Sequence, residues 1–304
     1  MIIDTLIKKM SKLEAPICVG LDPTESLMPS FLKDAAYKKM GQTPAALAEV
    51  FLRFNKEIID NVYDLVPALK IQIAMYEYLG LDGLNCYIET INYAKEKGLI
   101  IIGDIKRGDI TSSAAAYSHA HMGRVTVGES THKIFCHDIV TLAPYMGYDS
   151  IEPFAEDAVK YDKGMFILVK TSNPNSHQIQ DIKTSENKPL HEHVAKLVSD
   201  WGKSSIGAHG YSAVGAVVGC TYMEEAMHLR ALMPHTFFLL PGYGAQGATG
   251  AMLKPLLAYD NYGAIVNSSR GIIGAYKNNN NYHEQDFGKA ARDATLNMKE
   301  DLLQ

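Results

Sequence analysis

The sequence predicts a single (β/α)8 barrel, an α/β fold in which eight parallel strands close into a cylinder inside a ring of helices. Three observations predict it. Eight short apolar runs recur along the chain, and helical patterns fill most of the gaps between them. The runs are almost continuously apolar, as expected of strands buried on both faces. The length of 304 residues suits one such barrel with insertions, and no clear linker divides it, so we expect one domain over residues 1–304.

The expected elements follow one another in a regular order. The N-terminal stretch MIIDTLIKKMSKLEAP has apolar residues at helical spacing and predicts a short amphipathic helix that closes the bottom of the fold. A doubly wound sheet is the alternative, but no G-x-G-x-x-G follows the first strand. The eight expected strands are PICVGLD (16–22), ALKIQIA (68–74), LIIIGDIK (99–106), DIVTLAPY (138–145), GMFILVKTS (164–172), VGAVVGC (214–220), TFFLLPGYG (236–244) and GAIVNSSRG (263–271).

Composition excludes several classes of protein. A net charge of −5 argues against a general nucleic-acid binder, so an anionic ligand needs a local positive site. Cys18, Cys86, Cys136 and Cys220 are widely spaced without a C-x-x-C motif, which indicates reduced thiols in a cytoplasmic protein. No apolar run approaches the ~20 residues needed to span a membrane, and the N-terminus lacks the pattern of a signal peptide.

Charged side chains gather where the first three expected strands end. Asp22 follows the first strand, Lys70 and Gln72 lie in the second, and Asp104 and Lys106 end the third. Side chains two residues apart in a strand point to the same face, so these groups are expected to meet near the mouth of the barrel, where barrel enzymes place their catalytic residues. Alternation of lysines and carboxylates makes the burial of such charges tolerable and keeps Lys106 protonated. A purely structural ion-pair network is the alternative interpretation.

The last two expected loops resemble a phosphate cradle. Gly242, Gly244 and Gly247 in PGYGAQGATG allow close approach of the backbone to a ligand, and a helix is expected to start directly afterwards. Arg270 in NSSRG lies in the other loop and can bind phosphate oxygens with its guanidinium group. Barrels often bind phosphate after strands seven and eight. Tight turns without a ligand are the alternative.

Other polar segments give weaker signals. The loop over 173–189 either covers the mouth as a lid or is a solvated surface loop. His119 and His121, like His191 and His193, are two residues apart and do not share a helix face, so neither pair indicates a metal site. The sequence has no G-x-S-x-G, H-E-x-x-H or Walker motif, and we expect no metal.

Five motifs together resemble the orotidine 5′-phosphate decarboxylase family, and most closely its longer bacterial-type members. They are VGLDP, DIKRGDITSS, LVKTSNP, PGYGAQG and NSSRG, in that order over nearly the whole chain. The Asp-x-Lys-x-x-Asp element alone is shared with related barrels, whereas the five motifs together are specific. The resemblance implies decarboxylation of orotidine 5′-monophosphate to UMP, the last step of de novo pyrimidine nucleotide biosynthesis, without metal or organic cofactor.

The resemblance also implies roles for single residues. Lys106 would stabilise the carbanion at C6 of the pyrimidine and donate the proton, flanked by Asp104 and Asp109, with Lys70 completing the charged array. Asp109 would act in the neighbouring subunit's site, which implies a homodimer. The expected substrate contacts are Asp22 at the ribose, Thr171, Ser172 and Asn173 at the pyrimidine edge, Gln246 between base and phosphate, Gly242, Ser269 and Arg270 around the phosphate, and Ser113 near the partner's ligand.

Two positions depart from the subfamily pattern: Thr111 stands where glycine is usual, and Ser113 where threonine is usual. Three other functions stay open at this point. The first is a related Mg²⁺-dependent keto-acid phosphate decarboxylase or aldol-type synthase, against which KTSNP and PGYGAQG argue. The second is a Schiff-base aldolase, which a protonated Lys106 disfavours. The third is a nucleotide sensor that binds UMP without turnover.

Overall fold

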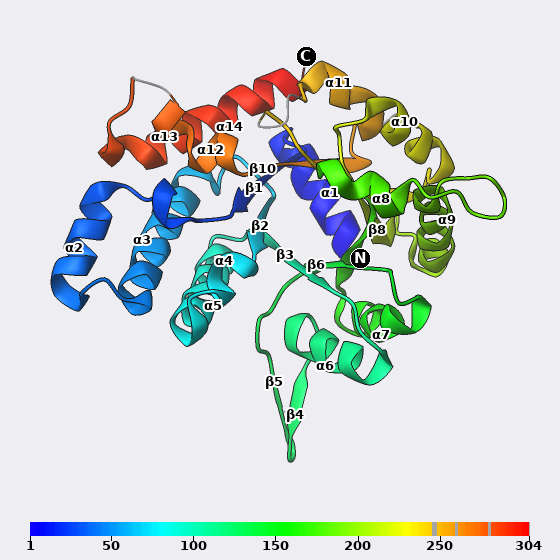
Figure 1. Ribbon diagram of the computed structural model, residues 1–304, viewed down its shortest axis with the longest axis horizontal. Helices are drawn as coiled ribbons and strands as arrows, with labels where there is room; N and C mark the ends of the chain where they lie inside the picture. Colours follow the sequence, from blue (N-terminus) through cyan, green and yellow to red (C-terminus); the bar gives the residue numbers. More distant parts are fainter. Residues whose placement is uncertain (245–247, 259–260, 279–280, 304) are drawn as a thin grey trace.

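Eight parallel strands close into a barrel in the computed structural model, which describes residues 1–244, 248–258, 261–278 and 281–303 (Figure 1). The order around the cylinder is β1-β10-β9-β8-β7-β6-β3-β2, and β1 pairs with both β2 and β10. The predicted fold and all eight predicted strands are confirmed. The barrel strands are β1 (Ile17–Leu21), β2 (Ala68–Gln72), β3 (Ile100–Arg107), β6 (Ile139–Leu142), β7 (Gly164–Lys170), β8 (Ser212–Val218), β9 (Thr236–Pro241) and β10 (Ala264–Ser268).

Helices surround the barrel, and among the described residues none is long and apolar enough to cross a membrane. The longer helices are α2 (Ser30–Met40), α3 (Pro44–Val62), α5 (Gly80–Glu96), α6 (Thr111–His121), α7 (Glu152–Tyr161), α9 (Leu190–Gly202), α10 (Met223–Leu232) and α14 (Phe287–Leu303). The short ones are α4 (Ala74–Glu77), α8 (His177–Gln180), α11 (Gly250–Leu253), α12 (Arg270–Ile273) and α13 (Ala275–Asn278). Single 3₁₀ turns are η1 (Glu25–Leu27), η2 (Tyr148–Ser150), η3 (Pro174–Ser176), η4 (Lys203–Ser205), η5 (Lys254–Leu257) and η6 (Glu284–Asp286).

Helix α3 illustrates how local sequence and packing agree. Thr43 caps its N-terminus by accepting a hydrogen bond from the amide of Ala46, and Pro44 occupies the first turn. Its apolar face is buried, and the ring of Phe54 stacks on Phe287 of α14 with 4.9 Å between the centroids. The last long helix is thereby joined to one of the first.

The N-terminal helix α1 (Ile2–Leu13) closes the bottom of the barrel, as the sequence predicts. Ile3, Leu6 and Met10 are fully buried and belong to one apolar cluster with strand residues such as Cys18 and Ile102. Because these strand residues lie at the amino-terminal halves of their strands, the floor of the barrel is apolar. The charged side chains that line the cavities lie at the opposite end.

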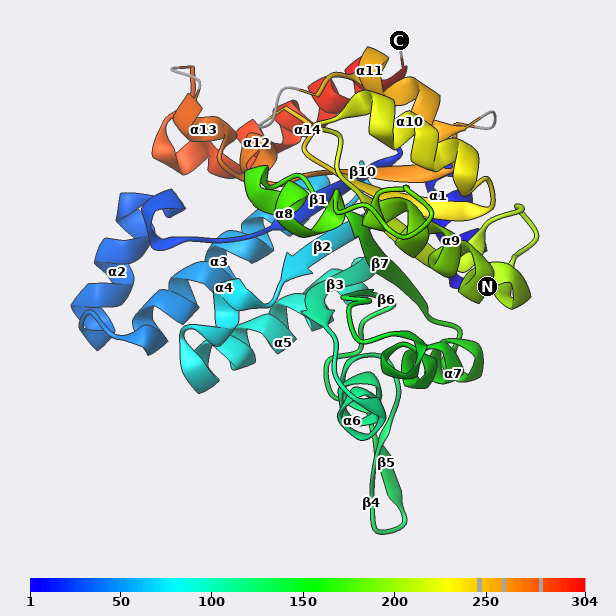
Figure 2. The ribbon, with the colours of Figure 1, turned by 45° about the vertical axis from the view of Figure 1, so that its right-hand side comes forward.

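A small β-hairpin is present that the sequence patterns do not predict. Strands β4 (Val125–Val127) and β5 (Ser130–His132) pair antiparallel and project away from the barrel in both views (Figures 1 and 2). Each strand has only three residues, which is too short for an alternating pattern to be recognised. The hairpin extends the connection between α6 and β6.

Two neutral histidines are buried between β3 and its covering helices. His137 is fully buried, its Nε2 lies 2.7 Å from the hydroxyl of Tyr87, and its ring stacks on His121. His121 also stacks on Phe135. Burial lowers the pKa of His121 to about 3 and lowers the pKa of His137 well below its usual value. Gly103 makes room for them, since a Cβ there would lie 2.7 Å from the His137 ring.

Because of these two buried histidines, we expect the free energy of unfolding to fall in mild acid. Their pKa values are depressed in the folded state, so below about pH 6.5 the unfolded chain binds more protons and the folded state loses free energy. Each buried histidine adds a slope of about 1.4 kcal/mol per pH unit between about pH 6.5 and pH 5. His121→Phe keeps the stack on Phe135 and should reduce the slope by about half. Urea unfolding at several pH values measures how the free energy of unfolding changes with pH. If this pH dependence were the same in His121→Phe and wild type, the account would be contradicted.

Candidate active site

Two adjoining cavities open at the carboxyl ends of the barrel strands and share Pro241 in their walls. One, of about 490 Å³, is lined by Lys70, Asp104, Lys106, Thr141, Leu168, Thr171, Ser172, Asn173, Gln180, Val217, Leu239 and Pro241. The other, of about 400 Å³, is lined by Asp22, Thr24, Ser26, Leu27, Met75, Pro241, Gly242, Tyr243, Asn267, Ser268, Ser269 and Arg270. The structure therefore places most of the predicted site residues around one continuous mouth.

The buried carboxylate of Asp104 is the centre of the first cavity. It lies 2.9 Å from Nζ of Lys70 and pairs on its other oxygen with Nζ of Lys106. Lys70 also reaches Asp22 at 3.2 Å. Gln72, the register partner of Asp104 on β2, donates a hydrogen bond to it at 3.1 Å. The prediction that these side chains from β1, β2 and β3 meet at the mouth is confirmed.

Mutual attraction keeps the buried groups charged. Burial disfavours the ammonium of Lys70, but the carboxylates of Asp104 and Asp22 outweigh this and raise the pKa of Lys70. Burial also disfavours the carboxylate of Asp104, yet Lys70 and Lys106 outweigh it and lower the pKa of Asp104 below its usual value. Both groups are therefore ionised at neutral pH.

An irregular strand end aims Lys106 at Asp104. The pairing of β3 with β6 shifts register between Gly103 and Arg107, and Lys106 adopts a left-handed backbone with φ of 45°. Such a backbone costs a non-glycine residue about 1–2 kcal/mol. Thr141 supports it, because its Oγ1 accepts a hydrogen bond from the amide of Lys106 at 3.0 Å and donates one to Asp104 at 2.9 Å. The side chain of Lys106 remains 45% exposed and lines the first cavity, so it is available to a ligand.

Asp109 does not join this array within one chain. Its carboxylate accepts a hydrogen bond from the amide of Ile110 at 2.7 Å, and among the described residues it forms no ion pair. Ser113 lies partly exposed on α6, away from the cavity linings. The neighbouring Arg107 is partly buried and pairs with Glu77 at 2.5 Å.

The residues after β7 form a second wall of the first cavity. Thr171, Ser172 and Asn173 all line it, as predicted. Gln180 of α8 binds Thr171 at two points: its Oε1 accepts from the amide of Thr171 at 3.0 Å, and its Nε2 donates to the hydroxyl at 2.7 Å. The hydroxyl of Thr171 in turn donates to Asn173 at 2.6 Å. The loop over 173–189 is therefore attached to the strand end through Gln180.

The second cavity contains the predicted phosphate residues. Gly242 has φ of 115°, a backbone that favours glycine, and Ser269 and Arg270 end the loop after β10. Oδ1 of Asn267 is buried there without a hydrogen-bond partner among the described residues. Gln246 and Gly247 lie outside the described residues.

One expectation for the phosphate end is wrong. The helix predicted to bind an anion after Gly247 is the single turn α11, and the amide of its first residue, Gly250, donates to Asp301 of α14 at 2.6 Å. Asp301 also accepts a hydrogen bond from the hydroxyl of Tyr243 at 2.8 Å. The Gly250 amide is therefore already bound by a carboxylate of the chain itself.

Three contributing residues are absent from the predicted site, and a fourth is predicted there without a role. Thr141 is the one polar residue within its expected strand core, and that interruption is the signal that could have identified it. Gln72 was placed on the right face but given no role. Gln180 carries no sequence signal, because its role comes from contact with Thr171 at the end of another element. Asn267 lies in the NSSRG motif, but its burial without a hydrogen-bond partner among the described residues cannot be predicted from that motif.

We expect the protein to lose much of its stability when the charge of Asp104, which lies between Lys70 and Lys106, is removed. Asp104→Asn keeps the shape but leaves two ammonium groups without their shared carboxylate, so the free energy of unfolding should fall by about 3 kcal/mol. Asp34→Asn on the exposed face of α2 is the control and should change it by less than about 0.5 kcal/mol. Urea unfolding at neutral pH compares the two. Equal stability of both variants would show that the array does not hold the fold together.

Comparison with known proteins agrees with this geometry. Residues 15–284 match the sequence pattern of the family described as "Orotidine 5'-phosphate decarboxylase / HUMPS family". The orotidine 5′-phosphate decarboxylase of Clostridium tetani is 42% identical over 304 residues, covering 100% of this chain and 98% of the relative. That of Petrotoga mobilis is 44% identical over 303 residues, covering 99% and 98%.

Solved structures agree as well. The OMP decarboxylase of Leishmania donovani superposes with a TM-score of 0.73 at 27% identity, covering 100% of this chain and 99% of its own. The decarboxylase of Methanocaldococcus jannaschii, solved with the inhibitor BMP, shares the fold with a TM-score of 0.60 at 16% identity, covering 95% and 98%. From the family match and the full-length relatives, the chain belongs to the orotidine 5′-phosphate decarboxylase / HUMPS family.

Proposed function

We propose that this protein is an orotidine 5′-phosphate decarboxylase, which converts orotidine 5′-monophosphate to UMP and CO2 in the last step of de novo pyrimidine biosynthesis. The observation that carries the proposal is the ammonium of Lys106, held by the buried carboxylate of Asp104 at the mouth of the barrel. Full-length relatives at 42% and 44% identity carry that activity in their names, which favours it over other members of the family.

The chemistry requires a fixed positive charge at one carbon. When the bond between C6 and the carboxylate breaks, CO2 leaves and the electron pair stays in an sp² orbital that the ring π-system cannot delocalise. An ammonium already aimed at that carbon stabilises the pair as it forms. Lys106 then transfers a proton to C6, which completes UMP, and its exposed end regains a proton from solvent.

Magnitudes show that Lys106 does not act alone. A unit ion pair at about 4 Å and an effective dielectric constant of about 20 is worth roughly 4 kcal/mol, or about three decades of rate. The remainder must come from binding energy at parts of the substrate remote from C6. The second cavity suits that task, because Arg270, Ser269 and Gly242 surround a space for the phosphate, and Asp22 lies where ribose hydroxyls can bind.

We propose that the reaction needs no metal ion. Asp22 and Asp104 are the carboxylates that line the two cavities, and Lys70 pairs with both of them while Lys106 pairs with Asp104. Ammonium groups therefore already fulfil the neutralising role that Mg²⁺ would have. This pairing disfavours the Mg²⁺-dependent alternatives.

Lys106→Ala should lower kcat by at least about 10³-fold, since it removes both the stabilising charge and the proton donor. UMP should still bind within a few-fold of the wild-type affinity, which separates this outcome from unfolding. Loss of orotidine absorbance in a continuous ultraviolet assay, with and without EDTA, measures the rate. Lys289→Ala on the exposed surface of α14 is the matched control.

Three results would count against the assignment. Activity retained by Lys106→Ala would reject the role of Lys106. Loss of wild-type activity in EDTA would reject the metal-free reaction. UMP binding by a wild-type protein that leaves orotidine absorbance unchanged would identify a nucleotide sensor instead of an enzyme.

We further propose a homodimer in which Asp109 completes the partner's site. Asp109 and Ser113 lie beyond the end of β3 and contribute nothing to their own chain's array. Large apolar side chains are exposed beside them and after β6, including Ile110, Met146 and Tyr145, the last at 87% exposure. Such side chains suit an interface between two copies.

Mixing two inactive variants tests the shared site. Lys106→Ala and Asp109→Ala should each be nearly inactive alone. When their subunits exchange, the mixed dimer contains one site with both native residues, so activity should return to about a quarter of the wild-type value at full exchange. No recovery after verified subunit exchange would place Asp109 in its own subunit's site or outside any site.

Two broader proposals rest on the same description. Residues 1–304 act as one domain, since α14 packs on α3 and Arg292 pairs with Asp64 at 2.7 Å across that contact. The protein works in the cytoplasm, which the free thiols of Cys18, Cys86, Cys136 and Cys220 support.

A further inference from the structure

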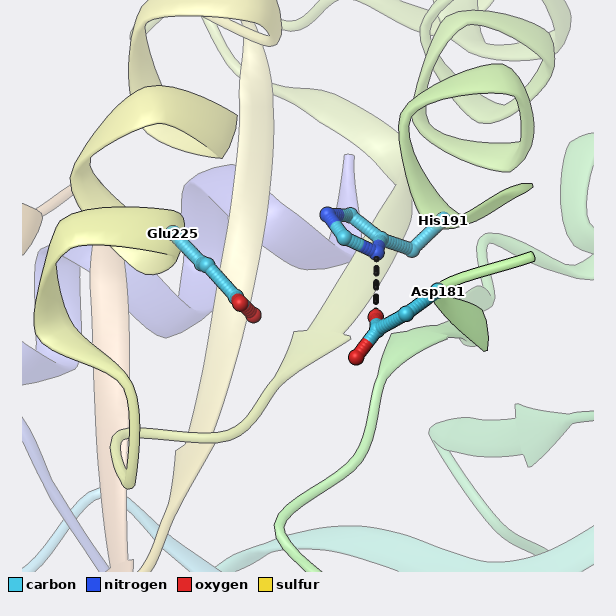
Figure 3. Close-up of side chains that lie close together, drawn as sticks. All are labelled: Asp181, His191 and Glu225. Carbon is cyan, nitrogen blue, oxygen red and sulfur yellow. Dashed lines mark hydrogen bonds and ion pairs between the residues drawn. The ribbon is translucent and has the colours of Figure 1, made fainter. Parts of the chain in front are cut away.

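A second cluster of charged side chains lies beside the mouth, outside the cavities. Lys170, the last residue of β7, has a side chain that is 2% exposed, and its Nζ pairs with Asp181 and with Glu225 of α10, the latter at 3.1 Å. His191 of α9 lies 3.1 Å from Asp181 through Nδ1. Figure 3 shows Asp181, His191 and Glu225 converging from three segments, with the dashed line joining His191 to Asp181. We call these four residues the charged latch.

A β-bulge turns Lys170 toward this cluster. Leu168 lines the first cavity, so strict alternation would point Lys170 the same way. The pairing of β7 with β8 shifts between these positions: Leu168 pairs with Val217 and Lys170 with the next residue, Val218. The extra residue on β7 re-aims the Lys170 side chain toward α10.

The latch contains a cation of its own. Ligand atoms of Asp181, His191 and Glu225 lie within 4.8 Å of one another, a spacing that suits a metal ion. Nζ of Lys170, however, already lies between the two carboxylates. Nδ1 of His191 is 3.0 Å from the carbonyl oxygen of Gln180, which only accepts hydrogen bonds, so this nitrogen carries a proton and cannot bind a metal. Lys170 therefore acts as the counter-ion that a metal would otherwise supply.

The latch adjoins the wall of the first cavity at two consecutive positions. Lys170 precedes Thr171 on the strand side, and Asp181 follows Gln180 on the loop side. Gln180 binds Thr171 through two hydrogen bonds, while Lys170 pairs with Asp181. Two neighbouring contacts therefore join the strand end to the loop. The hydrogen bonds between Gln180 and Thr171 face the cavity, and the ion pair between Lys170 and Asp181 faces α10.

We propose that Lys170 is a positioning residue, whose ammonium fixes the loop over 173–189 and α10 to the end of β7 and so holds Thr171, Ser172 and Gln180 in place for the pyrimidine base. This inference rests on the function proposed above. Without the ammonium, the carboxylates of Asp181 and Glu225 face each other unneutralised and repel, which frees the loop. None of the four latch residues is among the described residues that line the cavity of Arg270, so we expect the phosphate end, built on β9 and β10, to keep its shape.

Two ligands separate positioning from general destabilisation. Lys170→Met removes the charge at similar length, and UMP should inhibit it about tenfold to 100-fold more weakly than wild type. Ribose 5-phosphate, which lacks the base, should inhibit both proteins equally. Asp181→Asn, at a partly exposed position, is the milder variant should Lys170→Met fail to fold, and it should change UMP binding in the same direction. Glu186→Gln in the same loop, an exposed residue whose ion pair in the described part of the chain is with Lys188 at 3.9 Å, is the control.

Limited trypsin digestion provides a readout independent of substrate. Lys183 lies in the loop and is followed by Thr184, so trypsin cleavage after Lys183 should be faster in Lys170→Met than in wild type or Glu186→Gln. An unchanged cleavage rate in Lys170→Met would overturn the proposed role of Lys170. Equal weakening of inhibition by UMP and by ribose 5-phosphate would overturn it as well. A wild-type protein that neither binds UMP nor consumes orotidine 5′-monophosphate refutes the proposed function instead, while the digestion still decides the latch.

Discussion

The carboxylate of Asp104 is the group on which the mouth of this barrel depends. It is buried at the end of β3, and three strands supply its partners: Lys70 and Gln72 from β2, Lys106 from its own strand and Thr141 from β6. A buried carboxylate is tolerable only with such partners, and the lysines are tolerable only with the carboxylate. The same contact explains the left-handed backbone of Lys106, because that turn is what returns the ammonium to Asp104.

The two ends of the barrel differ: one end is an apolar core, and the other carries the charged side chains of the candidate site. Its floor is apolar and closed by α1, whereas its mouth carries ionised side chains that are neutralised by one another. Under the proposed function, different strands around the mouth would serve different parts of the substrate: β2 and β3 the reacting carbon, β7 the base, and β9 and β10 the phosphate. The charged latch applies the same principle outside the cavity, since Lys170 neutralises two carboxylates and joins three segments.

Sequence patterns predict this protein well where the strands are regular. The eight apolar runs are the eight barrel strands, and the two-residue spacing of Asp104 and Lys106 correctly places both at the mouth. The patterns fail where alternation breaks or where contacts join distant segments. The bulge before Lys170 hides its direction, and Gln180 gains its role only when α8 folds back onto Thr171. The anion site at α11 fails because Asp301, far along the chain, caps that turn, and the trans role of Asp109 stays a prediction.

The position of Lys106 in a complex with UMP tests the central claim most directly. A crystal structure of that complex should place Nζ of Lys106 about 3 Å from C6 of the pyrimidine while the ammonium still contacts Asp104. The phosphate should lie in the cavity that contains Arg270. A complex in which C6 faces away from Lys106, or in which Lys106 abandons Asp104 and points to solvent, would contradict the account.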